Sequence, residues 1–187
     1  MPDSARNAQD PTPYDDIVSR QYEAWPYPAP IEDVGVWCRN QWEWFDPSHA
    51  AGVLWPSHAP EGDLDILIAG CGTSQAAVFA YNNPGAHVLA IDVSHASLAH
   101  ETRLKEKHGL WNLELRALAI EELPTLERTF DLIVSTGVLH HMEDPATGLA
   151  ALRACLRPEG VIGLMLYGSQ GRTGIDSLRS AFRDAGL

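Results

Sequence analysis

The chain has 187 residues, of which 45% are hydrophobic, and this suits one globular domain with a short appendage. Its formal net charge of −12 argues against a nucleic-acid partner, because an acidic surface repels phosphate backbones. No apolar run is long enough to span a membrane, and the N-terminus lacks the apolar core of a signal peptide. The three cysteines match no disulfide or metal-binding pattern, so the sequence predicts a cytoplasmic protein.

Residues 1–62 are interpreted as an N-terminal arm. The polar, proline-bearing residues 1–13 predict disorder, and residues 14–25 predict a short helix that the following prolines end. Five of the six tryptophans lie in the first 55 residues. Two interpretations stay open: the arm simply packs on the main domain, or it forms a lid that excludes water from a ligand.

Residues 63–187 alternate between short apolar runs and helical stretches. Strands are predicted at 64–69, 87–92, 111–117, 130–138 and 161–168, with helices at 74–82, 94–109, 145–156 and 175–185. Ser94 and Gly109 are the expected caps of the second helix, and residues 157–160 are expected to form a turn. The alternation predicts an α/β fold with an open, doubly wound, mostly parallel sheet. Ligands of such sheets bind beyond the carboxyl ends of the strands.

The stretch LDILIAGCGTS, residues 64–74, predicts a buried strand, a tight turn and the start of a helix. Gly70 and Gly72 allow positive φ and a close approach of the backbone to a ligand. Gln75 stands where a dinucleotide-binding G-x-G-x-x-G motif has its third glycine, and no Gly-Lys-Ser/Thr phosphate loop is present. The spacing therefore disfavours a nicotinamide-dependent oxidoreductase.

Asp92 ends the second predicted strand, 20 residues after Gly72. A carboxylate at this position can accept hydrogen bonds from both ribose hydroxyls of a nucleoside. The alternative is an acid that serves the dipole of the helix that begins after Ser94. We favour the ribose role because the glycine turn precedes it.

Four segments resemble the class I S-adenosylmethionine-dependent methyltransferases, in the order of that family: ILIAGCGTS, VLAIDVS, FDLIVSTGVLHHMEDP and LRPEGVIGLMLYG. The resemblance covers about residues 63–168. It implies a Rossmann-like core, S-adenosylmethionine as cofactor and S-adenosylhomocysteine as product. The positions that it assigns to the cofactor are Gly70, Cys71, Gly72, Thr73, Ser74, Asp92, Val93, Ile120, Glu121, Thr136 and Gly137.

The chain departs from the family pattern at three positions. Ile68 replaces an acid that usually helps to hold the amino group of the cofactor, so another group must do so. Ser74 replaces a third glycine, and Ala119 stands where an acid commonly contacts the adenine amino group.

His140 and His141 follow the fourth predicted strand and are the candidate catalytic residues, because either can accept a proton near neutral pH. The alternative is a structural turn. The neighbouring acids show no further ligands, so no metal site is predicted. The Asn/Asp-Pro-Pro-Tyr/Phe signature of amino-group methylation on bases or glutamine is absent, which favours a small-molecule acceptor. Tyr14, Tyr22, Trp25 and Arg172 are the candidate lid and substrate residues.

The family ends with two further strands that this chain lacks. The core is therefore expected to be incomplete at its C-terminal edge: either the chain is a truncated form, or this edge is covered by the arm, a second copy or another chain. The competing function is a non-catalytic binding or regulatory module that has kept the fold.

Overall fold

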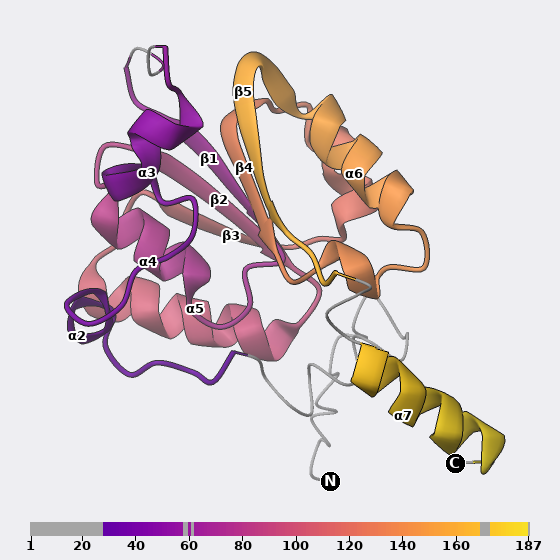
Figure 1. The fold of residues 1–187 in the computed structure, drawn as a ribbon. Coiled ribbons are helices and arrows are strands. Elements are labelled where there is room, and N and C mark those ends of the chain that lie inside the picture. Colours follow the sequence, from indigo (N-terminus) through magenta and orange to yellow (C-terminus); the bar gives the residue numbers. More distant parts are fainter. Residues whose placement is uncertain (1–27, 58–59, 61, 169–172, 187) are drawn as a thin grey trace, which may run out of the picture.

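A computed structural model describes residues 28–57, 60, 62–168 and 173–186. Its centre is a parallel sheet of five strands in the order β3-β2-β1-β4-β5 (Figure 1). The strands are β1 (Asp65–Ala69), β2 (His87–Asp92), β3 (Leu113–Ala117), β4 (Phe130–Thr136) and β5 (Leu156–Met165). The strand order reverses between β1 and β4, so the expected fold class is confirmed and the ligand-binding edge is at their carboxyl ends.

Helices cover both faces of this sheet (Figure 1). One face carries α2 (Val34–Cys38), α3 (Pro47–Leu54), α4 (Gln75–Asn82) and α5 (His95–His108). The other carries the 3-10 helices η1 (Ile120–Leu126) and η2 (Leu139–His141), together with α6 (Pro145–Ala154). The last helix, α7 (Thr173–Asp184), lies outside both layers in Figure 1. None of the described helices is long and apolar enough to cross a membrane.

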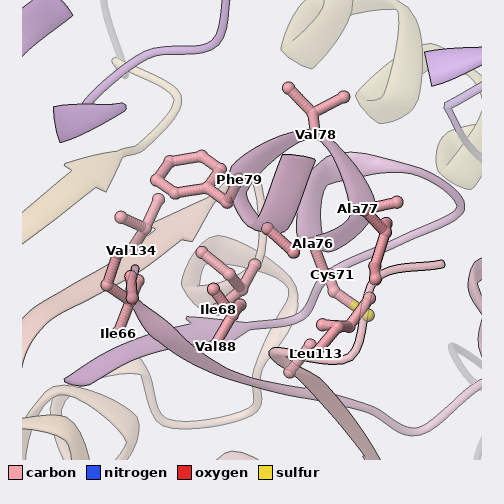
Figure 2. Packing of buried hydrophobic residues seen from close by; sticks show 14 of the residues in the cluster. Ile66, Ile68, Cys71, Ala76, Ala77, Val78, Phe79, Val88, Leu113 and Val134 are labelled. Atoms are coloured by element: carbon pink, nitrogen blue, oxygen red, sulfur yellow. The ribbon is translucent and has the colours of Figure 1, made fainter. Parts of the chain in front are cut away.

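Each face of the sheet has its own hydrophobic core. Ile66, Ile68 and Val134 point toward α4, where they meet Ala76 and Phe79 (Figure 2). The residues between them in the strands pack against η1 and α6 on the opposite face. Such strands are buried on both faces, which is why their sequences are continuously apolar rather than alternating.

The described part of the arm packs on the α4–α5 layer. Asp46 is fully buried, and its carboxylate accepts hydrogen bonds from the side chains of Asn82 and Asn83, each at 2.8 Å. Nearer the N-terminal end of the described arm, the carbonyl oxygen of Ile31 lies 2.9 Å from the Nε2 atom of His100 on α5. These contacts explain how residues 28–57 are fixed to the domain.

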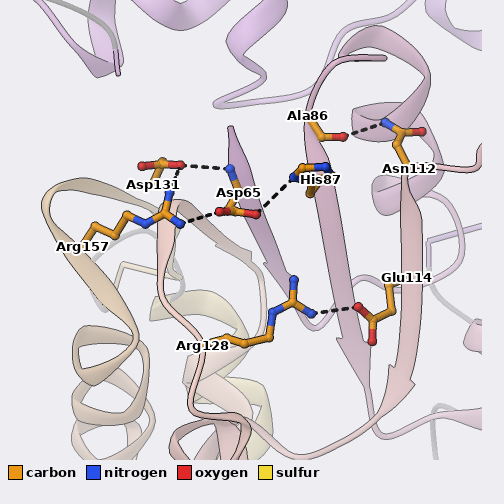
Figure 3. Close-up of polar contacts among 8 residues, drawn as sticks. All are labelled: Asp65, Ala86, His87, Asn112, Glu114, Arg128, Asp131 and Arg157. Atoms are coloured by element: carbon orange, nitrogen blue, oxygen red, sulfur yellow. Dashed lines mark hydrogen bonds and ion pairs between the residues drawn. The ribbon is translucent and has the colours of Figure 1, made fainter. Parts of the chain in front are cut away.

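The turn expected at residues 157–160 is wrong, because β5 already begins at Leu156. Phe130 pairs with Leu156 and Leu132 pairs with Val161, so a bulge takes up the additional residues. Proline is tolerated in a bulge since its missing N–H is not needed there. In this bulge, Arg157 bridges Asp65 and Asp131 at the amino ends of the strands (Figure 3).

Candidate functional site

The glycine turn after β1 is closed by backbone geometry that only glycine adopts easily. Gly70 has φ +78° and Gly72 has φ +57°. A Cβ on Gly70 would lie 2.4 Å from a methyl group of Val138, so the turn and the loop after β4 touch. The N–H groups of Gly70 and Cys71 both donate to the carbonyl oxygen of Ile91, at 2.9 and 3.0 Å. The turn is therefore fastened to the end of β2 as well.

Asp92 joins three loops of this edge. One carboxylate oxygen accepts the N–H of Gly72 at 2.8 Å and the other accepts the N–H of Ser94 at 2.9 Å. The Asp92 carbonyl oxygen accepts the N–H of Leu118 at 3.2 Å, which brings the loop after β3 beside it. A carboxylate oxygen has two lone pairs, so these bonds are compatible with a ribose role as well as with the helix-start role.

A second carboxyl group, which no sequence motif singled out, holds the start of α4. Glu101 on α5 is fully buried, and its two oxygens accept the N–H groups of Ala76 and Ala77, each at 3.0 Å. Desolvation raises the pKa of this carboxyl to about 8, although both hydrogen bonds oppose the shift. The signal in the sequence was an acid three residues from both Leu98 and Leu104, on the apolar face of a helix.

A hydrogen-bonded chain of side chains links the arm to the end of β4. The hydroxyl of Thr136 donates to the Oε1 atom of Gln75 at 3.1 Å, and the Nε2 atom of Gln75 donates to a carboxylate oxygen of Glu43 at 3.2 Å. Gln75 is buried in the first turn of α4. Neither Gln75 nor Glu43 was among the predicted site residues, because only the tertiary structure brings them to Thr136.

The other predicted cofactor positions lie along the same edge. Cys71 directs its side chain into the core beside Leu113, so its backbone alone can face a ligand (Figure 2). The Thr73 hydroxyl donates to the carbonyl oxygen of Pro28 at 2.8 Å, which ties the turn to the arm. Ser74 is the N-cap residue of α4, and Val93 is half-buried after β2.

Two more predicted positions follow β3, and one follows β4. Ile120 is buried and Glu121 is exposed at the start of η1. Gly137 has φ +76° and donates its N–H to the carbonyl oxygen of Met165 at 3.0 Å. The loops after β3 and β4 therefore reach the same edge as the glycine turn.

The two candidate catalytic histidines form an aromatic group with Tyr167, which follows β5. The ring centroids of His140 and Tyr167 are 3.9 Å apart, and those of His140 and His141 are 4.2 Å apart. His140 is half-buried, whereas His141 is exposed. Tyr14, Tyr22, Trp25 and Arg172 lie outside the described residues.

The loops at the carboxyl ends of the strands are acidic. Residues 70–75, 92–94, 118–122, 136–144 and 165–168 contain no Lys or Arg. Their acids are Asp92, Glu121, Glu122, Glu143 and Asp144. The described loops consequently attract cations and repel polyanions.

The chain matches one protein-family model and resembles two groups of known proteins. The family model described as "Methyltransferase domain" matches residues 67–162. An uncharacterised protein of Synechococcus sp. is 36% identical over 185 residues, which are 97% of this chain and 42% of that protein. The tRNA U34 carboxymethyltransferase of Methylococcus capsulatus is 31% identical over 116 residues, 62% of this chain and 36% of that enzyme. The chain thus spans about two fifths of the length of these relatives.

Solved structures share the fold. PKMT2 from Rickettsia typhi in complex with AdoHcy superimposes with a TM-score of 0.56 and 27% identity, over 63% of this chain and 24% of that one. The N-terminal domain of EvdMO1 with bound SAH gives a TM-score of 0.51 at 24% identity, over 59% of this chain and 45% of that one. This second likeness concerns the fold alone.

Proposed function

The chain belongs to the class I S-adenosylmethionine-dependent methyltransferases, and from that premise we propose that it binds S-adenosylmethionine and transfers its methyl group to a small-molecule acceptor. The observation that carries the proposal is the bond between Asp92 and Gly72, which places a carboxylate directly against the positive-φ glycine turn. PKMT2 from Rickettsia typhi, whose structure contains AdoHcy, supports the same cofactor.

The donors at the start of α4 support this ligand over a dinucleotide. A pyrophosphate is held by free N–H groups at a helix N-terminus. Here the N–H groups of Ala76 and Ala77 are already bonded to the Glu101 carboxyl group. S-adenosylmethionine has no phosphate, so the residues present fit it better than they fit NAD.

The proposed roles follow from the positions along the sheet edge. Asp92 accepts the ribose hydroxyls, Ile120 and Glu121 flank the adenine, and the backbone of Thr136 and Gly137 lies beside the reacting methyl group. S-adenosylmethionine supplies a methyl group that is already activated on a positively charged sulfur. The protein therefore needs mainly to align the acceptor with it.

A base assists when the acceptor loses a proton. We propose His141 for this step, because its side chain is exposed at the site and an imidazole titrates near neutrality. His140 stays a candidate for the same role. Its ring also contacts the rings of His141 and Tyr167, so it can instead hold these two side chains in place.

The acidic loops favour an uncharged or cationic small molecule over RNA, since a phosphate backbone would meet Glu121, Glu143 and Asp144. The relatives named tRNA U34 carboxymethyltransferase favour RNA as the second candidate acceptor.

Two measurements test the proposal. Calorimetric titration of the purified chain should show binding of S-adenosylmethionine and S-adenosylhomocysteine, whereas tight binding of NAD alone would overturn the cofactor. Methyl transfer from radiolabelled S-adenosylmethionine should then label a small-molecule extract. Label that appears only in total tRNA would replace the small-molecule acceptor by RNA, and binding without any transfer would favour the non-catalytic module.

A further inference from the structure

Glu43 is a carboxylate that the arm delivers to the edge of the sheet where the cofactor is proposed to bind. It is half-buried, and one of its oxygens accepts the N–H of the Gln75 amide, whose own oxygen accepts the Thr136 hydroxyl. Thr136 ends β4 at the proposed methyl-transfer position. The carboxylate is therefore two hydrogen bonds away from the end of β4.

The packing of Phe45 fixes which face of the sheet Glu43 covers. The ring of Phe45 lies against Gly163 of β5, and Gly163 pairs with Val134, which pairs with Ile68. Phe45 thus covers the row of residues that contains Ile68. Glu43 precedes Phe45 by two residues and, through Gln75, meets Thr136, which follows Val134 by two residues on the same face. It therefore lies beyond Ile68 toward the carboxyl ends of the strands.

The charge of Glu43 is not balanced by a cation in the described part of the chain. Its side-chain partner there is the neutral amide of Gln75, and no ion pair includes it. Desolvation raises the pKa of Glu43, and the nearby Asp46 raises it further. The Asp46 carboxylate is itself satisfied by Ser48, Asn82 and Asn83. A cationic ligand group would therefore be attracted to Glu43.

We propose that Glu43 supplies the carboxylate that binds the α-ammonium group of the cofactor's methionine moiety. This inference rests on the proposed function. S-adenosylmethionine carries an ammonium group, and Ile68 offers it no charge. Glu43 lies beyond Ile68 on the same face, as Asp92 does, and Asp92 is already assigned to the ribose. The arm then acts as a part of the binding site, not only as packing.

The substitution Glu43→Gln is a clean test because it keeps the shape and the hydrogen-bond acceptor for Gln75. Removal of a desolvated charge should leave the melting temperature unchanged or slightly higher. Glu32→Gln is the matched control, since Glu32 lies on the same arm with an exposed side chain.

Two ligands distinguish loss of the ammonium contact from a general loss of the binding site in the variant. S-adenosylhomocysteine carries the ammonium, whereas 5′-methylthioadenosine keeps the adenosine and sulfur but lacks the amino-acid part. Calorimetry should show that Glu43→Gln weakens S-adenosylhomocysteine about tenfold to hundredfold, the usual loss for a hydrogen bond to a charged group. The same variant should bind methylthioadenosine as the wild type does, and Glu32→Gln should change neither affinity.

The outcomes that contradict the proposal are distinct. Unchanged affinity for S-adenosylhomocysteine in Glu43→Gln, or an equal loss for both ligands, would remove Glu43 from the ammonium site while leaving the proposed function intact. Failure of the wild type to bind S-adenosylhomocysteine would instead overturn the proposed function, and this inference with it.

Discussion

The ring of Phe45 occupies the space that a side chain on Gly163 would need. A Cβ on Gly163 would lie 2.5 Å from the Cγ atom of Phe45. Phe45 itself has φ +65°, so its backbone is held in a conformation that residues with side chains rarely adopt. The absence of a side chain in the middle of β5 is thus what lets the arm reach the sheet.

We expect Gly163→Ala to lower the free energy of unfolding by about 1–3 kcal/mol, because the added methyl group forces the ring of Phe45 away. In a Phe45→Ala background the ring is gone and only the Cβ atom of residue 45 stays close, at 3.0 Å, so the same change should cost clearly less. Denaturant unfolding of the wild type, the two single variants and the double variant gives the coupling energy between Phe45 and the added methyl group. An equal cost in both backgrounds would show that Phe45 is not the obstacle.

Asp92 is expected to act on both stability and ligand binding, since it holds Gly72 and Ser94. Asp92→Ala should lower the melting temperature and weaken S-adenosylhomocysteine by about tenfold to hundredfold, because charge-assisted hydrogen bonds are lost. Asp92→Asn keeps one acceptor oxygen and should recover part of the stability. Asp63→Asn, at an exposed acid before β1, is the control. Unchanged ligand affinity in Asp92→Ala would remove Asp92 from the site.

The fold was predictable because its information is local. The central strands β1, β2 and β4 are largely apolar runs. Ser94 and Gly109 cap α5 as expected: Ser94 accepts the N–H of Ser97, and Gly109 is left-handed. The error at Arg157 arose because a Pro-Glu-Gly sequence is typical of a turn, whereas the bulge is decided by the pairing partner Phe130.

The site was predictable only in part, for a physical reason. The glycine turn and Asp92 are separated by one helix and one strand, α4 and β2, so their spacing could be interpreted from the sequence alone. Gln75, Glu43 and Glu101 depend on how α4, α5 and the arm pack together. These tertiary contacts cannot be predicted from the spacing of residues in the sequence.

Arg157 is expected to stabilise the fold without influencing the ligand site, because it lies at the opposite edge of the sheet, where it bridges Asp65 and Asp131 (Figure 3). Asp131 is 7% exposed, so Arg157→Ala leaves a largely buried carboxylate without its cation. The Arg157 side chain is itself 37% exposed, which limits the expected loss to about 1–3 kcal/mol.

The exposed Arg153 of α6 provides the control for Arg157. Chemical denaturation should show no measurable loss for Arg153→Ala. S-adenosylhomocysteine should bind both variants as it binds the wild type. A reduced affinity in Arg157→Ala alone would mean that the two edges of the sheet are coupled.

The raised pKa of Glu101 predicts that stability falls as the pH rises. Its pKa is raised from an ordinary 4.5 to about 8 by desolvation, so between these values the folded protein holds a proton that the unfolded chain has released. Stability contributed by this group is therefore complete below pH 4.5 and decreases as the pH rises toward 8. The decrease is at most about 1.4 kcal/mol for each pH unit.

Glu101→Gln removes the titrating group while keeping one acceptor for the N–H groups of Ala76 and Ala77. Its free energy of unfolding, measured by denaturant titration from pH 5 to pH 8, should fall less steeply than that of the wild type. Most other groups titrate alike in both proteins, so the difference between the two slopes reports Glu101 together with the acids coupled to it, Asp92 and Glu43. Parallel profiles would mean that Glu101 is ionised throughout this range, with its two backbone hydrogen bonds outweighing the cost of burial.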